Sequence, residues 1–179
     1  MFRVCGSRFL AAHVSLPQNG VDLPAPPRHQ LGCLLLTEDA AALTTRLEHD
    51  GYLRPLPERD AGWVPGDRTL FPDGFAGARI IVFDREQFVS SGQGGFRVWC
   101  PVDARNATAR FVPALEAWRR GGARSLACGC GGTHDLTALT YRPDCGFAKE
   151  WLEFSDVGGA EMVAPDALLE GVRVIWRRG

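Results

Sequence analysis

The chain has 179 residues, of which 45% are hydrophobic and 23% charged, and its formal net charge is −1. This composition is that of an ordinary globular protein, so it excludes a chain that is disordered throughout. The near-neutral charge gives no electrostatic support for nucleic acid or an anionic membrane as a partner. Arginine replaces lysine almost everywhere, Lys149 being the single lysine, which is typical of a GC-rich bacterial genome.

The expected location is the cytoplasm. No apolar run approaches the roughly 20 residues of a membrane span, and no signal-peptide cleavage site follows the N-terminus. In that compartment the six cysteines are expected as reduced thiols or metal ligands rather than disulfides. We expect the partner to be another protein, with no membrane involved.

Two regular elements are predicted before residue 55. A strand is predicted around residues 9–14, ahead of a proline-rich segment at 17–30 that is expected to be irregular. A helix is predicted over 38–50, because Thr37 can cap its start and Gly51 can end it.

The middle of the chain alternates loops with strands. Residues 55–78 carry several prolines and glycines, which predicts a loop. The sequence ARIIVFD at 78–84 is typical of a buried strand, and FRVWC at 96–100 is typical of a second one. We expect these two strands to pair as neighbours or as a hairpin around the turn at 90–95.

The last third is predicted to hold one regular helix and further strands. Apolar spacing predicts a helix that ends at Gly121, and the regular part is expected to start at Pro113, because proline disrupts a helix interior. A short helix is expected after Pro165. Further strands are predicted at 125–128, 135–141, 150–154 and 172–178.

Strands with interspersed short helices, without regular βαβ alternation, predict an α+β fold of mostly antiparallel strands. The organisation we expect is an N-terminal α+β lobe over 1–93 and a C-terminal ribbon-like α+β lobe over 94–179. The two lobes are either separate domains or halves that share one core.

The cysteine pattern of the second half predicts a metal site. Cys100 ends one predicted strand in WCPVD. Cys128 and Cys130 follow another in CGCGG, and Cys130 lies four residues before His134. Zinc prefers four tetrahedral sulfur and nitrogen ligands, and glycine permits the tight turns that aim backbone amides at thiolates. Asp103 is a substitute oxygen ligand. The two turns are therefore expected to converge with their sulfurs facing each other.

Over residues 96–154 the chain resembles a zinc-ribbon protein with one CPxC and one CPxCG knuckle. Asp103 stands at the second ligand position of the first knuckle, and the second knuckle has C-x-C in place of C-x-x-C. The resemblance implies either a structural zinc held by Cys100, Cys128, Cys130 and His134, or a ribbon that has lost its metal and is held by packing. Cys5, Cys33 and Cys145 are expected in the core.

Two functions follow from these patterns. No catalytic constellation stands out, so the first is a non-enzymatic binding or interaction module with a structural zinc site. Cys130 and His134 in CGGTH also resemble half of the zinc box in the editing domain of alanyl-tRNA synthetases, although no H-x-x-x-H half is present. The alternative is therefore a zinc- or thiol-dependent hydrolase of ester or aminoacyl bonds that uses Cys130 and His134.

Overall fold

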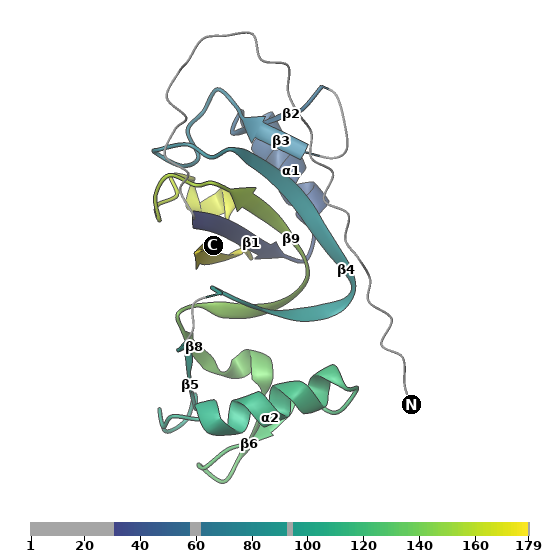
Figure 1. The fold of residues 1–179 in the computed structure, drawn as a ribbon, viewed down its shortest axis with the longest axis vertical. Helices are drawn as coiled ribbons and strands as arrows, with labels where there is room; N and C mark the ends of the chain where they lie inside the picture. Colours follow the sequence, from purple (N-terminus) through teal and green to yellow (C-terminus); the bar gives the residue numbers. More distant parts are fainter. Residues whose placement is uncertain (1–30, 58–61, 93–94, 179) are drawn as a thin grey trace, which may run out of the picture.

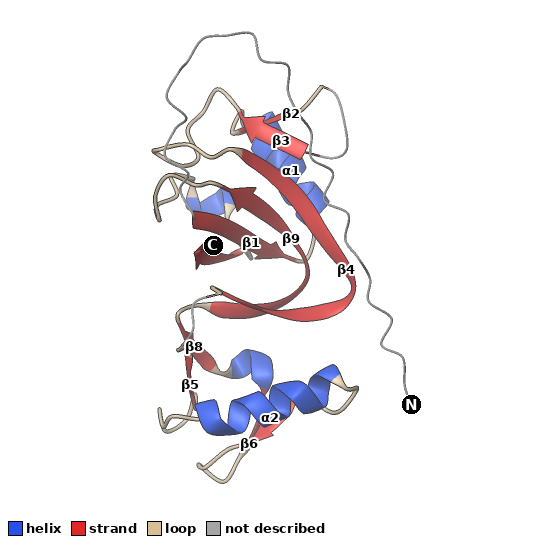
Figure 2. Cartoon of the chain, in the orientation of Figure 1, coloured by secondary structure: helices blue, strands red, loops and turns tan. Residues whose placement is uncertain are grey.

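A six-stranded antiparallel sheet, here called the main sheet, organises the fold (Figures 1 and 2). The structure, a computed structural model, describes residues 31–57, 62–92 and 95–178, so the strand predicted at 9–14 lies outside it. In chain order the strands are β1 (Leu31–Thr37), β2 (Leu53–Pro55), β3 (Gly62–Pro65), β4 (Gly77–Ser90), β9 (Cys145–Ser155) and β10 (Arg173–Arg178). Their spatial order is β10-β1-β9-β4-β3-β2. Within the described ranges no helix combines the length and apolar character that crossing a bilayer requires.

Between β4 and β9 the chain builds a small unit, here called the insertion, from residues 95–142 (Figure 1). Two two-stranded sheets, β5 with β8 and β6 with β7, pack with helix α2 around a second core. Cys145, Phe88 and Phe147 of the β4–β9 pair also pack into this core. The elements are β5 (Arg97–Trp99), α2 (Thr108–Arg119), β6 (Ser125–Ala127), β7 (Thr133–Asp135), the 3-10 helix η1 (Leu136–Ala138) and β8 (Thr140–Arg142). The main sheet takes strands from both sides of the insertion, because β1 pairs with β9 and β10.

The α+β class with mostly antiparallel strands is confirmed. The expected pairing of the strand at 78–84 with the strand at 96–100 is wrong, since β4 pairs with β9 and β5 pairs with β8. Local sequence does not specify which strands pair when a long segment, here the insertion, lies between them in the chain.

The long β4–β9 pair bends sharply at a bulge. Val82 lies opposite Glu150 and Gln87 lies opposite Ala148, so residues 83–86 face Lys149 alone. A bulge of this kind bends the strand and interrupts the regular alternation of side chains between the two faces of the sheet. The prediction of a buried strand at 78–84 is therefore wrong for most of its length. Only Ala78 is buried, Ile80 and Ile81 are half-buried, and Val82 is 62% exposed and Phe83 37%.

The larger core lies between the main sheet and helix α1 (Ala40–His49). Leu43 and Leu47, one turn apart, are fully buried there as their spacing predicts. The segment predicted to be loop over 55–78 also contains β3 and supplies Phe71 to this core, at 1% exposure. Proline and glycine content predicted the turns of this segment but not the apolar side chains that it adds to the core.

Two acidic side chains, rather than Thr37, cap helix α1. Asp39 is the N-cap residue, and its Oδ1 accepts a hydrogen bond from the Ala42 N–H at 2.8 Å. Glu150 reaches over from β9, and its Oε1 accepts from the Ala40 N–H at 2.8 Å. Carboxylates at this end satisfy free amides and interact favourably with the helix dipole.

Asp39→Ala is expected to lower the free energy of unfolding by about 1 kcal/mol, the usual cost of losing an N-cap side chain. Urea denaturation followed by circular dichroism measures this change. Thr37→Ala is the matched control, because the Thr37 hydroxyl accepts only the nearby Asp39 N–H. An equal loss in both variants would contradict the assignment of Asp39 as the cap.

Helix α2 begins before the proline that was expected to start it. It runs from Thr108, so Pro113 lies inside the helix. Asn106 Oδ1 accepts from the Thr108 N–H at 2.9 Å, and the fully buried Phe111 anchors the first turns. Tertiary packing thus outweighs the single hydrogen bond that the proline removes.

The segment predicted as one strand over 135–141 is broken into β7, η1 and β8. The Asp135 carboxylate accepts from the Thr137 N–H at 2.8 Å, which turns the chain there. The short helix after Pro165 is present as the 3-10 helix η2 (Asp166–Leu168), and the strand at 172–178 is present as β10.

Candidate metal centre

The four predicted ligands come together in the insertion. Cys100 directly follows β5, Cys128 and Cys130 lie in the turn after β6, and His134 lies in β7. Their three Sγ atoms and one imidazole nitrogen all lie within 4.8 Å of one another. The convergence of two distant turns, on which the metal prediction depended, is therefore confirmed.

The two separations from His134 fit a tetrahedral site. His134 Nε2 lies 3.2 Å from Cys130 Sγ and 3.5 Å from Cys100 Sγ. A tetrahedral zinc with bonds of about 2.3 Å to sulfur and about 2.0 Å to nitrogen holds such atoms about 3.5 Å apart. Only small shifts are needed for one ion to contact all four groups.

The turn around Cys128 and Cys130 is closed by its own backbone. The Cys128 N–H donates to the Gly132 carbonyl at 2.8 Å, and the Gly131 N–H donates to the Cys128 carbonyl at 3.2 Å. Gly131 has a φ of +87°, a conformation that glycine adopts without a steric penalty. The backbone N–H of Cys130 is the main group that holds the pKa of the Cys128 thiol below its ordinary value. This favours the thiolate, the form that binds metal.

The turn after β5 presents Cys100 from the other side. Its Sγ accepts a hydrogen bond from the Val102 N–H at 3.4 Å, while burial raises the pKa of the thiol to about 11. Asp103, considered as an oxygen ligand, is not one of the four clustered groups. Its carboxylate instead accepts from the Arg105 N–H at 3.0 Å, which is the main reason that its pKa is lowered.

The remaining described cysteines are core residues. Cys33 is fully buried in β1 and Cys145 is 1% exposed at the start of β9. Burial raises the pKa of Cys33 to about 12 and that of Cys145 to about 11, so both are neutral thiols at physiological pH. Cys5 lies outside the described residues.

Arg124 forms two ion pairs that the sequence did not predict, and one of them connects the insertion to the main sheet. Arg124 bonds both to Glu86 in the β4 bulge and to Asp135, whose carboxylate oxygen lies 3.2 Å away. Asp135 directly follows the ligand His134. Glu86 and Arg124 lie far apart along the chain, so no local pattern could have paired them.

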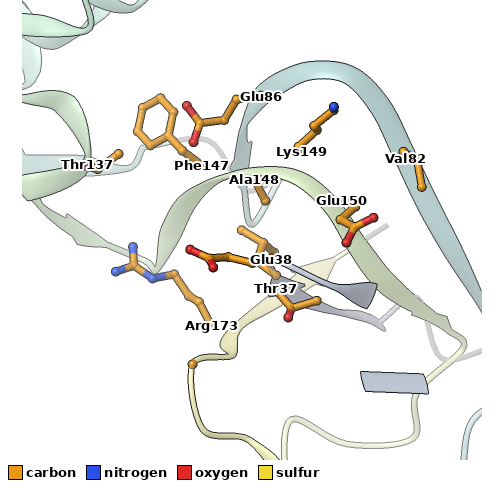
Figure 3. Close-up of a pocket in the computed structure, with 12 residues that line it drawn as sticks. Thr37, Glu38, Val82, Glu86, Thr137, Phe147, Ala148, Lys149, Glu150 and Arg173 are labelled. Atoms are coloured by element: carbon orange, nitrogen blue, oxygen red, sulfur yellow. The ribbon is translucent and has the colours of Figure 1, made fainter. Parts of the chain in front are cut away.

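A cleft of about 610 Å³ lies under the bend of the β4–β9 pair (Figure 3). Charged residues from several elements line it, among them Glu38, Lys149 and Arg173. None of the four clustered residues lines this cleft, the open groove of about 1190 Å³ across the main sheet, or the smaller cavity beside α1. The hydrolase alternative requires a pocket beside His134, and these three cavities do not supply one.

Comparison of the chain with models of protein families, with curated proteins and with solved structures found no match. The assignment of the site therefore rests on the chemistry and geometry of its own residues. Those residues form a buried to half-buried group of three thiols and one imidazole that is suited to hold a metal ion.

Proposed function

We propose that the chain is a non-enzymatic, cytoplasmic binding protein whose insertion is organised by a structural zinc ion. The observation that carries the proposal is the group of four ligand atoms within 4.8 Å of one another. Cys100, Cys128, Cys130 and His134 would hold the ion, giving a Cys₃His set that is one of the usual structural zinc sites. Bound zinc would cross-link the two turns and stabilise the folded insertion.

The choice of zinc follows from the donor types. Thiolate and imidazole ligands in a tetrahedral arrangement favour zinc over magnesium or calcium, which prefer oxygen. Four protein ligands also fill the tetrahedron, whereas a catalytic zinc keeps one position for water or substrate. A complete ligand set supports a structural rather than an enzymatic role, and the reducing cytoplasm keeps the thiols available.

Elemental analysis of the purified full-length chain tests the metal. We expect about one zinc per chain when the protein is prepared without chelators, as for a single four-ligand site. Cys130→Ser is expected to lose most of this zinc, because a hydroxyl is a much poorer zinc ligand than a thiolate.

Cys145→Ala provides the matched control for the loss of a thiol. Cys145 is buried outside the cluster and its Sγ donates to the Pro143 carbonyl, so this variant should keep its zinc. A wild-type chain with zinc near zero, or a Cys145→Ala variant that loses as much zinc as Cys130→Ser, would overturn the proposal.

A further inference from the structure

The charges of this protein are segregated between its two parts. The insertion contains seven arginines and three acidic residues, so its formal charge is +4 with His134 neutral. The whole chain carries −1, which leaves −5 for all other residues. Three thiolates and one divalent ion would lower the charge of the insertion by only one. The near-neutral total that argued against a polyanionic partner therefore conceals a basic surface.

Most of this positive charge is not compensated inside the protein. Arg124 and Arg105 form ion pairs, but the other five arginines of the insertion form none within residues 31–57, 62–92 and 95–178. Arginine stays protonated in proteins, so pH does not remove these charges. In the part of the chain that the structure describes, these five charges are left for solvent ions or a partner to balance.

The outer face of the β5–β8 pair concentrates two of these arginines beside an aromatic ring. Arg97 of β5 lies directly opposite Arg142 of β8, and both are exposed. The alternate residues Val98 and Tyr141 point into the core, so Trp99 shares the outer face with the arginines. The Arg142 guanidinium carbon lies 5.8 Å from the centre of the half-buried Trp99 ring.

This arrangement lowers the stability of the ligand-free protein and favours the binding of an anionic ligand. Like charges directly opposite each other on an antiparallel pair are destabilising, and a bound phosphate would turn that repulsion into attraction. Guanidinium groups bind phosphate with paired hydrogen bonds and also stack on flat rings. An indole ring beside them provides a surface on which an unpaired base can stack.

We infer that the outer face of β5 and β8 binds single-stranded nucleic acid, with Arg97 and Arg142 on phosphates and Trp99 against a base. The inference rests on the proposed binding function and names the class of its partner. An acidic peptide would pair with the arginines but would offer no base to stack on the Trp99 ring. A duplex would keep its bases stacked on one another, away from Trp99. Single strands satisfy both features.

Fluorescence anisotropy of labelled oligouridylate and oligothymidylate, each about 12 nucleotides long, tests the inference with the zinc-loaded full-length chain. We expect saturable binding at about 50 mM salt that weakens at least tenfold at about 200 mM, because phosphate contacts release counter-ions. Arg97→Ala/Arg142→Ala should weaken binding at least tenfold and flatten the salt dependence. Trp99→Leu should weaken it and leave the salt dependence unchanged.

Two matched variants separate this site from general charge effects. Arg79→Ala/Arg177→Ala removes the same charge from the main sheet and should bind as the wild type does. Arg97→Lys/Arg142→Lys keeps the charge and should recover most of the salt dependence. Zinc content and circular dichroism, measured on every variant, confirm that each is folded.

The inference is overturned by any of three results. The first is no anisotropy change up to about 100 µM protein at about 50 mM salt, where even non-specific phosphate binding is expected to register. The second is equal weakening in the main-sheet variant. The third is equally effective competition by a polyglutamate peptide of matched charge. Zinc content on the same samples keeps the two proposals distinguishable. Binding without zinc would refute only the metal, whereas zinc without binding would refute only the nucleic-acid site.

Discussion

Chelation of the metal is expected to unfold the insertion while the main sheet stays folded. The core of the insertion is small, and the buried ligands Cys100 and Cys128 are part of it. Structural zinc contributes roughly 10 kcal/mol or more to the folding of small zinc domains at neutral pH. The main sheet has its own core between its strands and α1, to which none of the four ligands belongs. Loss of the ion should therefore act locally.

Hydrogen exchange monitored by mass spectrometry measures this directly. After treatment with a strong chelator, amides of β6 and β7 should exchange much faster, while those of β1 and β9 keep their protection. Adding zinc back should restore slow exchange. If β6 and β7 kept full protection without metal, packing alone would hold the insertion, which is the other state that the cysteine pattern left open.

Truncation of Phe71 is expected to have the largest effect on the main sheet. This side chain is 1% exposed, and its ring meets Phe154 and Phe75 edge to face, with centroids 5.0 and 5.6 Å away. Phe71→Ala should lower the free energy of unfolding by about 3–5 kcal/mol, because it removes this contact area and leaves a cavity. Urea denaturation of the zinc-loaded chain measures the loss.

Val82→Ala is the control for this prediction, since Val82 is an apolar side chain that is 62% exposed at the β4 bulge. Its cost should stay within about 0.5 kcal/mol, as for most surface substitutions. A loss below about 1 kcal/mol for Phe71→Ala would show that the segment before β4 is not part of the cooperative core.

The four candidate ligands could be singled out from sequence because the signal of each turn is local and chemical. Cys128 and Cys130 stand among glycines, and His134 follows Cys130 by four residues, whereas Cys100 ends a predicted strand just before Pro101. Strands at 96–100 and 125–128, and the amphipathic spacing of Leu43 and Leu47, were also readable, because each depends on a few neighbouring side chains.

The features that the sequence concealed depend on distant partners. The bend at residues 83–86 exists because β9 lacks the matching residues, and the early start of α2 exists because Phe111 is buried against other elements. The Arg97–Arg142 pair was likewise invisible, since two arginines so far apart in the chain become neighbours only through the β5–β8 register. The net charge of the whole chain does not show where such like-charged pairs lie.

The register of β4 and β9 has a consequence for how the insertion is anchored. Ser90 and Cys145 are paired residues of the main sheet, so both ends of the insertion are held side by side in the folded chain. Pairing of the two long strands therefore closes the loop that contains the insertion, and the entropy cost of closing it grows only slowly with its length. A bound ion would have to order only two short turns, and the insertion could change in length or content with little disturbance to the strands that anchor it.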